Sequence, residues 1–175
     1  MSLKIAFTGP ESTGKSSLSS LVAKELNGLN IPEFAREYLE KTNGYYEEKD
    51  LDIIALGQYN SVQESKSNFI VVDTEMTVMK VWSLFKYGQV SETIQNLYQQ
   101  EKLDHLFLCD IDIPWEEDPL REHPESRAEL FDIYHKLLID KGVEFTIVKG
   151  SIAERLAQVV QVLKEKNALL LVNPK

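Results

Sequence analysis

The segment from Lys4 to Ser16 constrains this chain more than any other part of its 175 residues. An apolar run, Ile5-Ala-Phe7, leads into Gly9-Pro-Glu-Ser-Thr-Gly-Lys-Ser16, which matches the pattern G-x-x-x-x-G-K-[S/T] at every fixed position. The two glycines let backbone amides turn inward and form an anion nest, and the helical pattern that follows directs the positive end of its dipole to the same place. This context favours a phosphate-binding loop over a chance glycine-rich turn.

The loop predicts a role for several of its side chains. Lys15 brings a positive charge to the β- and γ-phosphates of a nucleoside triphosphate, and Ser16 offers a hydroxyl to Mg²⁺. The nucleotide-binding residues expected within the loop are Gly9, Glu11, Ser12, Thr13, Gly14, Lys15, Ser16 and Ser17.

Length and composition limit what else the chain can be. Its 175 residues suit one compact domain, 1–175. The single cysteine, Cys109, lies in an apolar strand-like run, which excludes internal disulfides and Cys-rich metal clusters. The net charge of −9 argues against a nucleic-acid partner. Without a membrane-length apolar stretch or a signal-peptide pattern, we expect a cytoplasmic protein with no membrane partner, and leave open a homo-oligomer.

Apolar, β-branched runs alternate with amphipathic helical patterns along the chain, which is typical of a parallel sheet with crossover helices. The expected fold is α/β, a three-layer sandwich around a central parallel five-stranded sheet. The expected strands are 4–8, 30–34, 68–73, 105–110 and 144–148. The expected helices are 15–26, 50–67, 75–86, 92–101, 127–140 and 152–166. Capping boxes at Ser126/Glu129 and Ser151/Glu154 predict where the last two helices begin.

A carboxylate closes the third expected strand. Phe69-Ile-Val-Val-Asp73 has the shape of a Walker B strand, whose carboxylate lies at the carboxyl end of the sheet and holds Mg²⁺ opposite Ser16. The alternative is that Asp73, together with Thr74, caps the following helix. The phosphate-binding loop favours the Mg²⁺ role.

The segment 32–38 follows the second expected strand and is a candidate acceptor site. Glu33 is placed to take the proton of an attacking hydroxyl, and Arg36 to hold a hydroxyl or phosphate oxygen. An exposed helix start is the alternative, and residue types alone slightly favour it. The expected substrate-binding residues are Glu33, Phe34, Arg36, Glu37, Tyr59, Asp73 and Glu75. The aromatic candidates for holding a ring are Phe34, Tyr38 and Tyr59.

The segment 110–125 is irregular and polar and carries three of the six prolines, which is typical of a lid. Arg121 is the candidate residue to bind ATP and to close over its γ-phosphate. Arg127 is a weaker candidate, because its place in the helix predicted by the capping box already accounts for it. The alternative is a solvated acidic loop pinned by Trp115. The three histidines show no metal-ligand spacing.

The remaining sequence separates the classes of protein that share the loop. The guanine-reading N-K-x-D and the D-x-x-G switch of GTPases do not occur, and the charge balance does not support a helicase. A small-molecule kinase needs a phosphate loop, a Mg²⁺ carboxylate, an acceptor pocket and a lid, and the chain offers a candidate for each.

Five blocks in this order resemble the nicotinamide riboside kinase domain of NadR-type proteins. They are Gly9–Ser16, Glu33-Phe-Ala-Arg-Glu-Tyr38, Ala55-Leu-Gly-Gln58, Val72-Asp-Thr-Glu75 and Asp112-x-x-Trp115-x-x-Asp118-x-x-Arg121. The resemblance implies adenylate-kinase-like strand order, ATP and Mg²⁺ as cofactors, and phosphorylation of nicotinamide riboside to nicotinamide mononucleotide in NAD salvage.

For this activity the candidate catalytic residues are Lys15, Glu33, Asp73 and Arg121. The H-x-G-H motif of an adenylyltransferase does not occur, so the next step of NAD synthesis is not expected. Two alternatives stay open: a kinase of another nucleoside or small metabolite, and a regulatory P-loop ATPase module.

Overall fold

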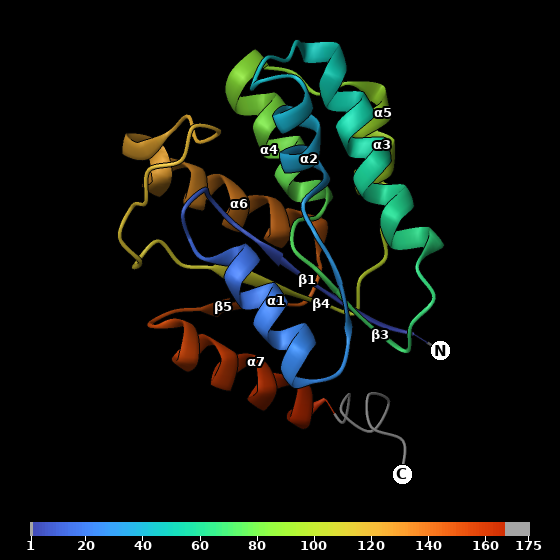
Figure 1. Ribbon diagram of the computed structural model, residues 1–175, viewed down its shortest axis with the longest axis vertical. Coiled ribbons are helices and arrows are strands. Elements are labelled where there is room, and N and C mark those ends of the chain that lie inside the picture. The colour runs from blue at the N-terminus through green and yellow to red at the C-terminus, as the bar shows by residue number, and fades with distance from the viewer. Residues whose placement is uncertain (1, 167–175) are drawn as a thin grey trace.

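The computed structural model describes residues 2–166 and contains a five-stranded, fully parallel sheet in the order β2-β3-β1-β4-β5 (Figure 1). The strands are β1 (Leu3–Thr8), β2 (Leu29–Ile31), β3 (Phe69–Val72), β4 (His105–Cys109) and β5 (Phe145–Val148). The helices are α1 (Lys15–Glu25), α2 (Phe34–Lys41), α3 (Glu48–Glu64), α4 (Met76–Tyr87), α5 (Glu92–Gln100), η1 (Pro124–Ser126), α6 (Arg127–Lys141) and α7 (Ile152–Glu165). The expected α/β class and strand order are confirmed.

Helices cover both faces of the sheet, which explains why the central strands are apolar at nearly every position. Alternate residues of β1, such as Ile5 and Phe7, pack with α1 and α7 on one face. Ala6 faces the opposite side, where α3, α4 and α6 contribute Val62, Val81 and other apolar residues. Figure 1 shows α1 and α7 together on one side of the sheet and the remaining helices on the other.

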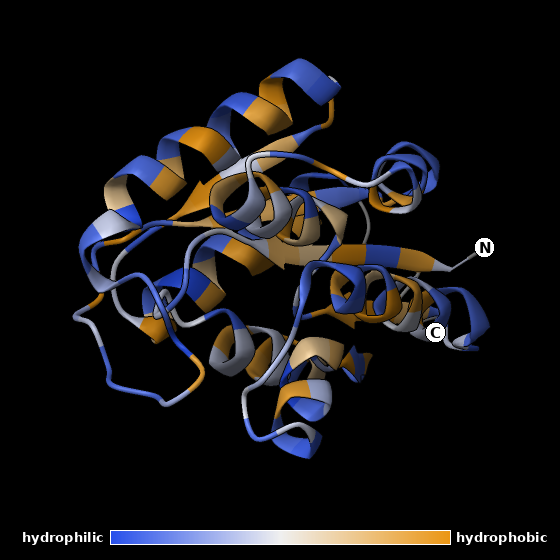
Figure 2. Cartoon of the chain, turned by 90° about the horizontal axis from the view of Figure 1, so that it is seen from above, coloured by the Kyte–Doolittle hydropathy of each residue, from blue (hydrophilic) through white to orange (hydrophobic). Residues whose placement is uncertain are grey.

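A second helical layer lies beyond that face. Apolar side chains of α2, α3, α4 and α5, including Leu51, Ile54, Met76 and Ile94, form a cluster of their own. In Figure 2 most helices carry alternating hydrophobic and hydrophilic segments, whereas the strands at the centre are largely hydrophobic. Because of this layer, α2 and α4 lie beyond the carboxyl ends of the strands, on the side of the sheet where the phosphate-binding loop lies.

The largest differences from the sequence expectation are a shorter second strand and an additional helix, α2. The second strand ends at Ile31 because Pro32 has no amide to continue the ladder. The chain turns instead into α2, and the Gln58 side chain accepts a hydrogen bond of 2.7 Å from the Phe34 amide. Part of the expected strand 30–34 is therefore the start of a helix.

The predicted helix caps have mixed outcomes. The Ser151/Glu154 capping box is present, whereas the Ser126 hydroxyl makes no cap hydrogen bond because a 3₁₀ turn leads directly into α6. Neither Asp73 nor Thr74 caps α4, because the N-cap is Glu75, whose side chain accepts from the Thr77 amide. Within the described residues, no helix combines the length and apolar character needed to cross a membrane.

Candidate active site

The phosphate-binding loop has the conformation that its glycines predict. Gly9 has a φ of 124°, and a Cβ at this position would lie 2.9 Å from the Cys109 carbonyl oxygen, so no larger residue fits. Gly14 is left-handed at a φ of 77° and immediately precedes α1. Lys15 Nζ donates to the carbonyl oxygens of Gly9 at 2.8 Å and Pro10 at 2.6 Å. The ammonium group is thereby held at the loop, where phosphates are expected to bind.

A buried arginine supports this loop from behind. Arg155 of α7 is fully buried, and its guanidinium donates to the Thr13 carbonyl at 2.7 Å, the Asp110 carbonyl at 3.0 Å and the Gly150 carbonyl at 2.9 Å. It also pairs with the Asp112 carboxylate. One side chain therefore joins the phosphate-binding loop, the root of the lid and the turn before α7. Arg155 is not among the residues predicted from the sequence, although a charge four residues before the buried Val159 was an available signal.

We expect Arg155→Met to lower the free energy of unfolding by about 2–4 kcal/mol, because one buried and two partly buried carbonyl oxygens lose this donor and Asp112 loses its ion pair. The affinity for an ATP analogue should fall as well, since the loop loses its support. Urea unfolding and calorimetric titration would measure both effects. Lys164→Met, at an exposed position of the same helix, is the matched control and should leave both unchanged.

An acidic corner lies at the carboxyl end of β3. Asp73 is 4% exposed, and its Oδ1 has no hydrogen-bond partner among the described residues. Burial raises the pKa of this carboxyl, while the side chains of Ser16, Lys15 and Arg36 act in the opposite direction. The pKa of Glu33 is also raised, first by burial and then by the nearby Asp73 charge. Two carboxyl groups thus face the phosphate-binding loop.

The donor set of this corner fits Mg²⁺. Among the described residues no group of three or more His, Cys, Asp or Glu forms an all-protein metal cage. Mg²⁺ is usually held by one or two carboxylates together with water and substrate phosphates, so a cage is not required. The unpartnered Asp73 oxygen and the Ser16 hydroxyl are the groups that would hold the ion, directly or through water.

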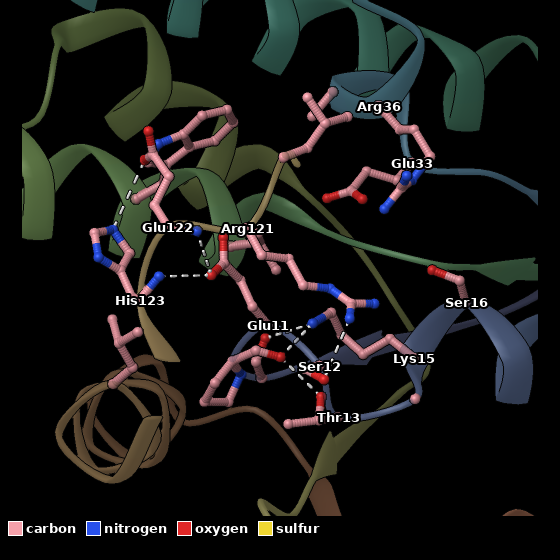
Figure 3. A pocket seen from close by; sticks show the side chains of 18 of the residues that line it. Glu11, Ser12, Thr13, Lys15, Ser16, Glu33, Arg36, Arg121, Glu122 and His123 are labelled. Atoms are coloured by element: carbon pink, nitrogen blue, oxygen red, sulfur yellow. Dashed lines mark hydrogen bonds and ion pairs between the residues drawn. The ribbon is translucent and has the colours of Figure 1, made fainter. Parts of the chain in front are cut away.

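The segment 110–125, which we predict to be a lid, lies against the phosphate-binding loop (Figure 3). The Ser12 hydroxyl accepts from the Glu116 amide at 2.8 Å and from the Arg121 guanidinium at 3.3 Å. The Glu11 carboxylate accepts from the amides of Glu122 and His123, each at 3.1 Å. The structure therefore brings Arg121 to the loop. Arg127 instead donates to the carbonyl oxygens of Ser12 and Ile113 and braces the backbone.

Arg121→Ala should lower kcat by about 10²-fold or more and change the affinity for ATP much less. The reason is that a charge aimed at the transferred phosphoryl group matters most when charge develops in the transition state. Steady-state kinetics together with the Kd of a non-hydrolysable ATP analogue would separate the two effects. An unchanged kcat in the folded variant would assign Arg121 to a structural role in the lid.

A cavity of about 280 Å³ extends from the phosphate-binding loop to α4. Its far wall is aromatic: Tyr46 and Trp82 meet edge to face with ring centroids 4.9 Å apart, and Phe85 lies on the same wall. Glu33 and Arg36 line the cavity between the loop and this wall. The phosphate-binding loop, Glu33 and the aromatic wall therefore line one cavity.

The aromatic residues expected to hold a ring lie elsewhere. A Cβ at Gly57 would be 2.4 Å from the Phe34 ring, so Phe34 packs on α3 and reaches only a second, outer pocket. The Tyr38 hydroxyl donates to Asp50 at 3.0 Å, and Tyr59 packs in the helical layer. The structure offers Tyr46 and Trp82 of the cavity wall in their place.

The expected acceptor carboxylates and Arg36 are also separated. Glu75 is 1% exposed, accepts from the Thr77 amide and hydroxyl at 2.7 Å each, and lines neither pocket. Glu37 lines only the outer pocket and is exposed in an ion pair with Lys41. Arg36 lines both pockets and pairs with Asp118 of the lid at 3.1 Å. Of the expected acceptor carboxylates, Glu33 lines the cavity, whereas Asp73 lies beside Ser16 of the loop and lines only the outer pocket.

A parallel sheet in this order, with a phosphate-binding loop after β1 and a lid between β4 and α6, defines the fold of the P-loop kinases. The chain belongs to the family described as "AAA domain", which matches residues 4–155.

Cys109, expected in a strand, is buried in β4, and burial raises the pKa of its thiol to about 11.

The comparisons confirm the resemblance to NadR-type proteins. The chain is 28% identical over 171 residues to the trifunctional NAD biosynthesis/regulator protein NadR of Salmonella typhimurium, covering 92% of this chain and 42% of that protein. The chain thus spans less than half the length of this curated relative.

Solved structures show the same fold. A NadR protein in complex with NR superimposes on this chain with a TM-score of 0.79, and a NadR protein in complex with NAD and AMP-PNP superimposes with a TM-score of 0.76. Each is 21% identical in sequence, and each match covers 94% of this chain and about half of the NadR chain. Deoxyadenosine kinase from M. mycoides has a TM-score of 0.69 at 16% identity and covers 93% of this chain and all of its own.

Proposed function

We propose that the chain is an ATP-dependent small-molecule kinase whose acceptor is the 5′-hydroxyl of nicotinamide riboside, with nicotinamide mononucleotide as the product. The observation that carries this proposal is the single cavity with Lys15 and Ser16 at one end and the Tyr46–Trp82 wall at the other. The similarity to a NAD biosynthesis protein and to a NadR complex with NR supports the choice of acceptor.

The chemistry of the cavity favours a riboside over a nucleoside monophosphate. Carboxylates such as Glu33 accept hydrogen bonds from ribose hydroxyls, while they repel an acceptor that already carries a phosphate. Arg36, which lines the cavity beside Glu33, is already paired with Asp118. An aromatic wall made of Tyr46 and Trp82 suits a cationic pyridinium ring through stacking and cation–π contact.

In this proposal, residues 1–175 form one kinase unit with a lid at about 110–125, and phosphoryl transfer proceeds in line. The acceptor oxygen bonds to the γ-phosphorus as the bond to the ADP oxygen breaks, and Glu33 takes the hydroxyl proton. Lys15 and Arg121 offset the charge that develops on the transferred group. Asp73 and Ser16 are the residues that would hold Mg²⁺, and the ion would supply further neutralisation of phosphate charge.

A panel of acceptors tests the proposal directly. Nicotinamide riboside, adenosine, cytidine, deoxyadenosine and two nucleoside monophosphates are supplied with ATP and Mg²⁺, and ADP release is coupled to a visible reaction. We expect the highest kcat/KM with nicotinamide riboside. Faster turnover of a monophosphate, or ATP hydrolysis that no riboside stimulates, would overturn the proposal; the second result would favour a regulatory ATPase.

A further inference from the structure

Two neighbouring lid residues point to opposite ends of the cavity. The Arg121 guanidinium donates to Ser12 of the phosphate-binding loop. The side chain of Glu122 leaves the lid toward the acceptor wall, where it accepts from the Tyr46 hydroxyl at 2.8 Å and from Lys86 Nζ at 2.9 Å. Figure 3 shows Arg121 over the loop and Glu122 on the side of the aromatic rings. The lid therefore contacts the nucleotide side and the acceptor side through successive residues.

The Tyr46 hydroxyl is the centre of the acceptor-side contact. It accepts from Trp82 Nε1 at 2.8 Å and from Lys86 Nζ at 2.5 Å, and it donates to Glu122. Lys86 also lies over the Tyr46 ring at 4.0 Å from its centroid. A ligand that packs against the rings of Tyr46 and Trp82 would therefore also restrain the Tyr46 hydroxyl, which is hydrogen-bonded to Glu122 of the lid.

The backbone at the same position is attached to the nucleotide side. The amides of Glu122 and His123 both donate to the Glu11 carboxylate of the phosphate-binding loop. Because Glu122 carries both attachments, the contact of its amide with Glu11 keeps its carboxylate within reach of Tyr46 and Lys86 at the acceptor wall. The two contacts are expected to form together.

We propose that Glu122 is a positioning residue that makes acceptor binding and nucleotide binding favour one another. An acceptor ring that orders Tyr46 and Trp82 stabilises the closed lid, which in turn holds Arg121 over the phosphates. Linkage requires the effect to be reciprocal, so bound nucleotide strengthens acceptor binding by the same factor. This inference rests on the proposed function only in placing the acceptor at the Tyr46–Trp82 wall.

The test measures the Kd of AMP-PNP with Mg²⁺ by calorimetry, with and without saturating nicotinamide riboside. In the unmodified chain we expect the acceptor to tighten nucleotide binding by about fivefold or more. In Glu122→Ala this factor should fall to near one, whereas the Kd for AMP-PNP alone changes little. Glu122 is 38% exposed, so the substitution leaves the core intact.

Two further variants separate coupling from a general effect on the lid. Glu117→Ala removes an exposed lid carboxylate for which the described part of the chain shows no hydrogen bond or ion pair, and it should keep the full coupling. Tyr46→Phe keeps the ring but removes the hydroxyl, and it should lose the coupling as Glu122→Ala does. A purely structural role of Glu122 would change thermal stability and not this ratio.

The outcomes distinguish this inference from the proposed function. Coupling that persists in Glu122→Ala, or that is absent from the unmodified chain while nicotinamide riboside is still phosphorylated, would overturn the role of Glu122 alone. If the acceptor panel selects a different riboside, that compound replaces nicotinamide riboside and the expected ratios are unchanged. If no riboside binds, both proposals fail.

Discussion

Lys15→Ala is expected to lower kcat for phosphoryl transfer by about 10³-fold while the chain stays folded. The ammonium group lies at the phosphate-binding loop, and within residues 2–166 it donates hydrogen bonds only to the Gly9 and Pro10 carbonyl oxygens. Its loss removes a charge that is needed when negative charge shifts in the transition state, and water can solvate the two carbonyl groups. Assays that quench the reaction at fixed times and quantify ADP and the phosphorylated product would measure the loss of kcat.

Lys24→Ala is the matched control, because Lys24 lies in the last turn of the same helix and is exposed. It should retain full activity. Circular dichroism and thermal melting would verify that both variants keep the fold. Normal turnover by Lys15→Ala would show that the loop does not bind the transferred phosphate.

Local patterns predicted the loop and most of the sheet. The spacing of Gly9, Gly14 and Lys15 predicts the backbone conformation of the phosphate-binding loop. Buried parallel strands can be recognised in the sequence as short apolar runs. The sequence left the segment 32–38 open between an acceptor site and a helix start, and it did not show that Gln58, from a helix more than twenty residues away, holds the Phe34 amide where α2 begins. A contact of that kind leaves no local signal.

The aromatic wall of the cavity was missed for a similar reason. Tyr46 lies before α3 and Trp82 lies within α4, so their contact exists only after the helical layer has packed. Aromatic residues close to Glu33 in sequence were the natural candidates. However, the Phe34 ring packs on α3, where Gly57 has no side chain and leaves room for it. Proximity in the chain was a poor guide to proximity in the cavity.

Glu33→Gln should lower acceptor-dependent turnover by about 10²–10⁴-fold, because a general base is replaced by an amide of the same shape. Binding of Mg²⁺ with an ATP analogue should stay close to that of the unmodified chain. Asp73→Asn is the isosteric contrast: it should weaken the Mg²⁺ dependence and turnover together. If Glu33→Gln impaired Mg²⁺–nucleotide binding instead, the roles of the two carboxylates would have to be exchanged.

The pH dependence adds a second test of Glu33. Burial and the Asp73 charge raise its pKa above 4.5, so the base is protonated over a wider acid range and kcat/KM should rise through this higher pKa. A carboxyl whose pKa is raised by folding stabilises the fold below its unfolded pKa, and that stability is lost as pH increases. Glu33→Gln should therefore be more stable than the unmodified chain at neutral pH, with the difference vanishing in acid. A variant that gains stability at neutral pH while losing turnover would show that the fold tolerates this buried carboxylate for its chemistry. Equal stability at every pH would contradict that account.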